Sequence, residues 1–111
     1  MEGPKLQIQE ELLLAKQSRI EGNEGRARVC ARRAAGAAVQ THLQRTGLSP
    51  EPGNAMQSIM LFKSIMDLPE RVQIALDWLL QRVDEDYNLP PEVDLIQEAD
   101  IVIRFVEGKE P

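Results

Sequence analysis

The chain has 111 residues and a formal net charge of −5, with 42% hydrophobic and only 4% aromatic residues. This length supports one domain with a real hydrophobic core, and the hydrophobic content is too high for a disordered chain. No apolar run approaches the length of a membrane span. An acidic chain is also a poor general binder of nucleic acid, because phosphate affinity comes mainly from Lys and Arg.

The charge is unevenly spread along the chain. Residues 1–55 contain eight Lys or Arg and six acidic residues, whereas residues 56–111 contain five and 12. This asymmetry permits a head-to-tail contact or a local basic patch, and it is equally compatible with an ordinary solvated surface.

Cys30 is the only cysteine, so no internal disulfide can form. Its position in an Ala-rich helix favours a small apolar role over that of a reactive thiol. The first nine residues, MEGPKLQIQ, lack the apolar stretch of a secretion signal. We therefore expect a cytoplasmic protein.

The first helix is predicted over about residues 4–20. Leu6, Leu13 and Ile20 form one line along it, which Leu12, Leu14 and Ala15 widen. The sequence Glu21-Gly22-Asn23 then ends this helix.

The second helix is predicted from Asn23 or Glu24, with Asn23 as the N-cap, to a stop at Gly47. Small residues recur on one face at i, i+3 and i+4 spacing, namely Ala27, Ala31, Ala34, Ala35 and Ala38. Because small side chains let a neighbouring backbone come close, we expect this helix at the centre of a bundle.

Three further helices are predicted over about residues 54–66, 69–83 and 91–107. The helix over residues 54–66 is apolar nearly all round, so it is either buried on several sides or covered by a partner. The helix over residues 69–83 begins with a capping signal at Asp67, Pro69 and Glu70. Pro91 opens the third. The predicted fold is all-α, an antiparallel up-down bundle of four main helices plus one short helix.

The second helix also carries a group of basic side chains. Four of them are candidates for binding a phosphate or carboxylate, namely Arg28, Arg32, Arg33 and His42. Arginines of this kind more often pair with acids on neighbouring helices, and a histidine near a helix end is more often packed or capping. As the sole histidine, His42 excludes a multi-histidine metal site, and we predict no metal and no cofactor.

Ile74 and Trp78 form a second apolar stripe on the fourth helix, and Phe105 adds an apolar face to the fifth. These three residues are our interface candidates, unless a compact bundle buries them. The acidic run Asp84-Glu85-Asp86 reads as a solvated turn.

The chain resembles the HEPN superfamily (higher eukaryotes and prokaryotes nucleotide-binding) over about residues 10–108. The resemblance rests on ELLLAKQSRIEGN, on the Ala-rich helix GRARVCARRAAGAAVQTHLQRTG, and on the closing pair that begins ALDWLLQRVDEDYNLPP and continues EVDLIQEADIVIRFVEG. It implies a single four-helix domain, often dimeric. Some members are ribonuclease toxins of toxin–antitoxin pairs, and others are non-catalytic partners of a minimal nucleotidyltransferase.

The chain departs from the nuclease pattern of that superfamily. No arginine precedes His42 at the spacing of the Arg-x4–6-His motif, and Asp86 stands where many relatives have arginine. Asn54 and Gln57 stand where relatives often place a histidine. We therefore assign no catalytic residue.

The function expected from the sequence is that of a non-catalytic HEPN-like interaction domain. It would act as a homodimer, or as a heteromer with a nucleotidyltransferase-like protein. One alternative is a regulatory nucleotide- or anion-binding module that uses the four basic side chains. The other is a ribonuclease built from Arg32, Arg33, His42 and Arg45 across a dimer.

Overall fold

The computed structural model describes residues 3–48, 54–65, 67–81 and 93–108. Within these ranges the chain forms five helices and no strand, which confirms the all-α prediction. The helices are α1 (Gly3–Ile20), α2 (Glu24–Arg45), α3 (Ala55–Ile65), α4 (Glu70–Leu80) and α5 (Leu95–Val106). No helix among the described residues is long and apolar enough to cross a membrane.

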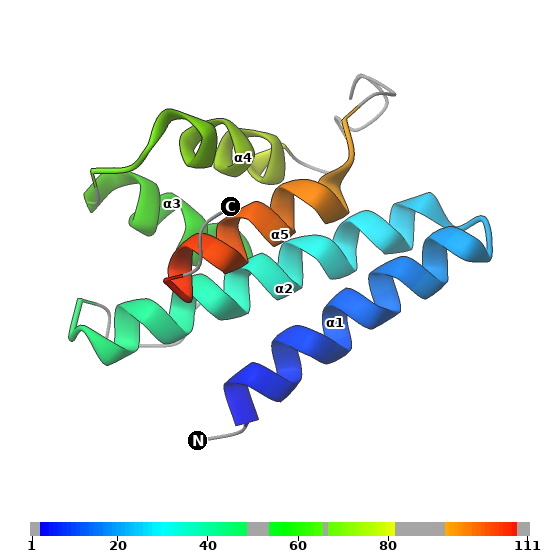
Figure 1. Ribbon diagram of the computed structural model, residues 1–111, viewed down its shortest axis with the longest axis horizontal. Coiled ribbons are helices and arrows are strands. Elements are labelled where there is room, and N and C mark those ends of the chain that lie inside the picture. The colour runs from blue at the N-terminus through cyan, green and yellow to red at the C-terminus, as the bar shows by residue number, and fades with distance from the viewer. Residues whose placement is uncertain (1–2, 49–53, 66, 82–92, 109–111) are drawn as a thin grey trace.

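Helix α2 runs through the middle of the molecule (Figure 1). Helix α1 lies antiparallel along one side of it, and α5 and α3 contact it elsewhere, while α4 packs on α5 and α3. The α1–α2 turn uses Gly22, whose φ of 84° favours glycine, and Asn23, whose side chain accepts a hydrogen bond from Arg26 N at 3.0 Å. The N-cap predicted at Asn23 is confirmed.

The small residues of α2 explain its central position. All five predicted alanines are at most 1% exposed. Three of them share the main core with Phe62 of α3, Leu76 of α4 and Val102 of α5, namely Ala27, Ala31 and Ala35. The other two, Ala34 and Ala38, pack with Ile8 of α1 and Ile103 of α5. Gly36 lies where α3 begins. A Cβ at this position would be 2.5 Å from Ala55 Cβ, so only glycine allows this approach of the two helices.

Helix α1 presents an unexpected face to its neighbours. Its buried residues are Ile8, Ala15 and Ser18, whereas Leu6, Leu13 and Ile20 are 53%, 66% and 85% exposed. The predicted apolar line therefore faces solvent. The reason is that small Ala15 fits against the alanines of α2, so the contact face of α1 is set by close packing and not by its largest side chains.

The start of one helix differs from prediction. Helix α4 begins after Pro69, which occupies the N-cap in an extended conformation, and no side chain caps it. The predicted Asp67 cap is wrong, because Asp67 lies three residues before the first helical residue. The predicted capping-box role of Glu70 is wrong as well, since Glu70 is itself that first residue.

Helix α5 begins at Leu95, where Asp94 Oδ1 accepts from Ile96 N at 3.0 Å and Gln97 N at 3.3 Å. Its predicted start at Pro91 lies outside the described residues.

Candidate interaction surface

The basic side chains of α2 do not converge on one site. Arg32 is only 6% exposed and points at the end of α4. Its Nε donates to the Leu79 carbonyl at 2.9 Å and its Nη2 donates to the Gln81 carbonyl. The last carbonyls of a helix have no partner within the helix, so Arg32 stabilises the end of α4.

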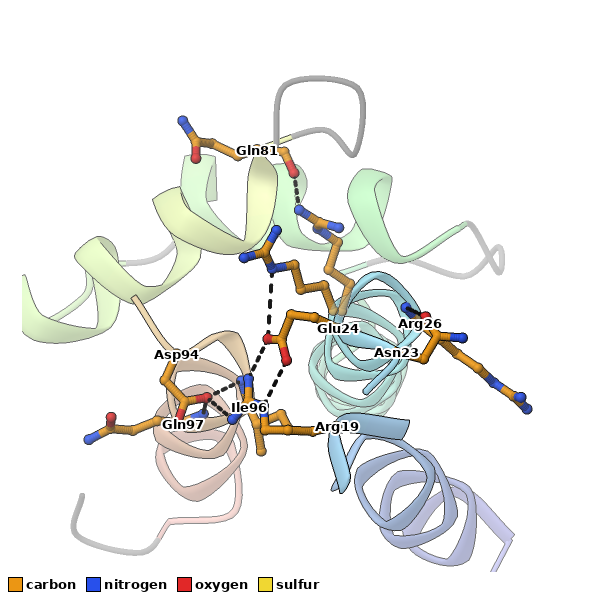
Figure 2. Close-up of polar contacts among 10 residues, drawn as sticks. Arg19, Asn23, Glu24, Arg26, Gln81, Asp94, Ile96 and Gln97 are labelled. Atoms are coloured by element: carbon orange, nitrogen blue, oxygen red, sulfur yellow. Dashed lines mark hydrogen bonds and ion pairs between the residues drawn. The ribbon is translucent and has the colours of Figure 1, made fainter. Parts of the chain in front are cut away.

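Arg28 lies one turn away and joins a cluster of charges where α1 ends and α2 and α5 begin. Its Nε is 3.9 Å from Glu24 Oε2. Arg19 donates to both carboxylate oxygens of Glu24, at 3.0 and 2.7 Å, and to Asp94 Oδ1 at 2.8 Å (Figure 2). The cluster therefore ties three helix ends together.

The same contacts shift two pKa values. The hydrogen bond with Glu24 raises the pKa of Arg19 despite some desolvation, and Asp94 adds to the increase. Burial alone would raise the pKa of Asp94, but the hydrogen bonds from Arg19 and from the first amides of α5 outweigh it, so the pKa of Asp94 lies below its ordinary value.

The other two candidate side chains lie apart from this cluster. Arg33 is exposed and lines an open cleft between α1 and α2 together with Glu11 and Gln40. His42 packs edge-to-face on Phe62, with ring centroids 5.7 Å apart, and its Nδ1 is buried without a hydrogen-bond partner among the described residues. The structure thus brings Arg28 and Arg32 to one end of the bundle and separates Arg33 and His42 from them.

Cys30 is buried, and desolvation together with the nearby Glu11 carboxylate raises the pKa of its thiol. A raised pKa keeps the thiol protonated and unreactive. The environment of Cys30 therefore agrees with a packing role. Within the described part of the chain, no group of three or more His, Cys, Asp or Glu side chains is placed to hold a metal ion.

Two of the three predicted interface residues lie together on α4. Ile74 is 41% exposed and Trp78 is partly buried, and both line a small open pocket with Asp77 and Gln81. Phe105 lies on α5, partly buried against the main core.

Among the described residues, α1 carries more exposed large apolar side chains than any other helix. Three of them form the line that we call the α1 row and define as Leu6, Leu13 and Ile20. These three side chains are more than half exposed. Their seven-residue spacing places them within about 40° of one another around the helix axis. That spacing is visible in the sequence, but only the structure shows that the row faces outward.

Neither a family model, nor a curated protein, nor a solved structure matches this chain.

Proposed function

We propose that this chain is a non-catalytic helical interaction domain of the HEPN type that binds another protein chain through apolar side chains on its surface. The observation that carries the proposal is the exposure of the α1 row. Single exposed apolar residues are ordinary, whereas three that recur every second turn on one helix face are the feature from which we infer a docking surface. We place its action in the cytoplasm.

The contacts of the basic side chains support this function over anion binding. Arg32 binds the carbonyls at the end of α4, and Arg28 shares Glu24 with Arg19. These are roles in helix capping and in joining helix ends. Two of the four candidate anion-binding side chains are thus already bound within the fold, and this favours the interaction function over anion binding.

The HEPN resemblance suggests the class of an external partner, a minimal nucleotidyltransferase. Affinity capture of the tagged chain from its source lysate, followed by mass spectrometry, tests this partner. We expect a stoichiometric protein that is lost with Leu13→Lys and retained with Leu48→Lys. Leu48 is a matched control, because it is 49% exposed and lies outside α1.

The pocket beside Ile74 and Trp78 is a second docking position that the same experiment examines. Loss of the captured protein with Ile74→Lys, but not with Leu13→Lys, would move the docking surface to α4. Capture that is unchanged in both variants, together with an unchanged mass of the isolated protein, would contradict the proposed function.

A further inference from the structure

We infer that the α1 row is the self-association face of this protein, and that it pairs with α1 of a second copy in parallel, in register, about a two-fold axis along the helix. This inference rests on the proposed interaction function and names the partner. The argument uses the position of the row, the charges beside it, and the surroundings of α1.

The row lies opposite the side on which α1 contacts the rest of the molecule. At about 100° per residue, buried Ala15 and Ser18 lie about 160° and 140° from Leu13 around the helix axis. Both are at most 3% exposed, while Leu13 is 66% exposed. In Figure 1, α1 is the outermost helix on its side of the bundle, and α2 lies beside it. A second helix can therefore approach the row without meeting another part of the fold.

The row has one basic edge and one acidic edge. Lys5 and Lys16 lie about 80° and 60° to one side of Leu13, and Glu10 and Glu21 lie about 60° and 80° to the other. The backbone bond from Glu21 N to Gln17 O, 3.0 Å long, keeps Glu21 in helical register. All four side chains are exposed, and none forms an ion pair with another described residue.

This pattern of charges is complementary to itself in one orientation. In a parallel pair related by a two-fold axis along the helices, the basic edge of one α1 meets the acidic edge of the other. Lys5 then faces Glu10 of the second copy, and Lys16 faces Glu21 of the second copy. Both pairs are offset by five residues. With the row at heptad position a, Lys5 and Glu10 hold the g and e positions that form ion pairs across parallel two-stranded coiled coils, whereas Lys16 and Glu21 hold d and b.

The antiparallel alternative is disfavoured by the same charges. A two-fold axis perpendicular to the helices brings the acidic edges of the two copies together on one side and the basic edges together on the other. Like charges brought together oppose association. The apolar row can pair with itself in both directions, so the charges decide the orientation.

The size of the row predicts the strength of the pair. Helix α1 has 18 residues, which corresponds to a length of about 27 Å. Polar residues fill the space between successive members of the row, so the contact is smaller and wetter than a standard interface. We therefore expect a dimer that dissociates on dilution and weakens with added salt.

Disulfide cross-linking tests the orientation. A parallel pair places Leu6 beside Leu6 of the second copy, so Leu6→Cys alone should cross-link under mild oxidation, and so should Ile20→Cys alone. The unmodified chain is the control, because its only thiol, Cys30, is buried. Cross-linking that requires a mixture of Leu6→Cys and Ile20→Cys would overturn the parallel arrangement.

Charge exchange tests the edges in solution by light scattering of the full chain. The double variant Lys5→Glu/Lys16→Glu should raise the dimer dissociation constant about tenfold or more, because each new Glu faces an acid. Adding Glu10→Lys and Glu21→Lys to the same chain should restore the dimer. No restoration would overturn the pairing of the edges.

The outcomes also separate this inference from the proposed function. An unmodified chain that stays monomeric at high concentration, yet loses a captured protein with Leu13→Lys, would refute self-pairing and leave the interaction function standing. If Leu13→Lys changes neither the mass nor the captured proteins, the α1 row is no interface and the self-pairing inference fails. The interaction function fails with it if Ile74→Lys also changes nothing.

Discussion

At the scale of single residues, Gly36 sets the distance between α2 and α3. The atoms that a Cβ would meet at this position include Ala55 Cα at 2.6 Å, which belongs to the backbone and cannot rotate away. The beginning of α3 therefore depends on the absence of a side chain in α2. The many small residues of α2 do not by themselves show that position 36 must be glycine.

We predict that Gly36→Ala lowers the free energy of unfolding by about 1–3 kcal/mol, because α3 must shift to accept the methyl group. Gly25→Ala is the matched control. A Cβ there meets only Asn23 Oδ1 at 3.9 Å, and the change should stabilise α2 by up to about 1 kcal/mol. Urea unfolding followed by circular dichroism measures both, and equal effects would contradict the close approach.

Arg32 and Arg33 are adjacent in sequence and have different roles. Arg32 is buried and binds the carbonyls of Leu79 and Gln81, whereas Arg33 is exposed. We predict that Arg32→Met lowers the free energy of unfolding by about 2–3 kcal/mol, because it removes charged hydrogen bonds to a buried carbonyl and a partly buried one. Arg33→Met should change stability by less than about 0.5 kcal/mol. Chemical denaturation of the two variants checks the difference, and similar losses would refute the capping role.

At the scale of helices, the ends of α1, α2 and α5 are held by shared charges. Asp94 caps α5 and also accepts a hydrogen bond from Arg19, which in turn binds Glu24. One carboxylate thus stabilises the start of one helix and links it to the end of another. This arrangement makes the junction sensitive to acid.

The pKa of Asp94 is lower in the folded protein than in the unfolded chain, so Asp94 binds its proton more weakly when folded. Its stabilising effect is present above about pH 4 and is lost as the pH falls through the folded-state pKa. We predict that the native protein loses more stability than Asp94→Asn between about pH 5.5 and pH 2.5, since asparagine keeps the cap without the charge. Thermal unfolding across this range tests the prediction, and parallel losses would contradict it.

The sequence predicted the positions of the helices better than it predicted which face of each helix is buried. The alanine spacing of α2 and the cap at Asn23 follow from local rules, and both are confirmed. The direction of the α1 row does not follow from such rules. Burial of Ala15 in place of Leu13 depends on how closely α2 approaches, and this is a property of the pair of helices.

In the candidate site, too, features that depend on neighbouring residues in the sequence could be predicted, and features that depend on the packing of distant helices could not. Ile74 and Trp78 are one turn apart, so their position on one face of the helix could be predicted from spacing, whereas the pocket that both line is seen only in the structure. The separation of Arg32 from Arg33 could not be predicted, because it depends on where the end of α4 lies. The acceptors of Arg32 are 47 and 49 residues away in sequence.

At the scale of the whole molecule, the fold places its alanine-rich helix inside and an apolar row outside. Helix α2 contacts α1, α3 and α5, whereas α1 keeps one face free (Figure 1). The charges beside that face complement each other only between two copies in parallel. Our central claim is that this outer face of α1 is the face through which two copies of the chain associate.

The measurement that tests this claim most directly is sedimentation equilibrium of the native chain and of Leu13→Lys over a range of concentrations. We predict that the native chain approaches twice the monomer mass as concentration rises, while Leu13→Lys remains monomeric and folded and Leu48→Lys still dimerises. Folding of Leu13→Lys should be unimpaired, because Leu13 is 66% exposed. A native chain that sediments as a monomer at every concentration, or a Leu13→Lys variant that dimerises as well as the native chain, would contradict self-association through this face.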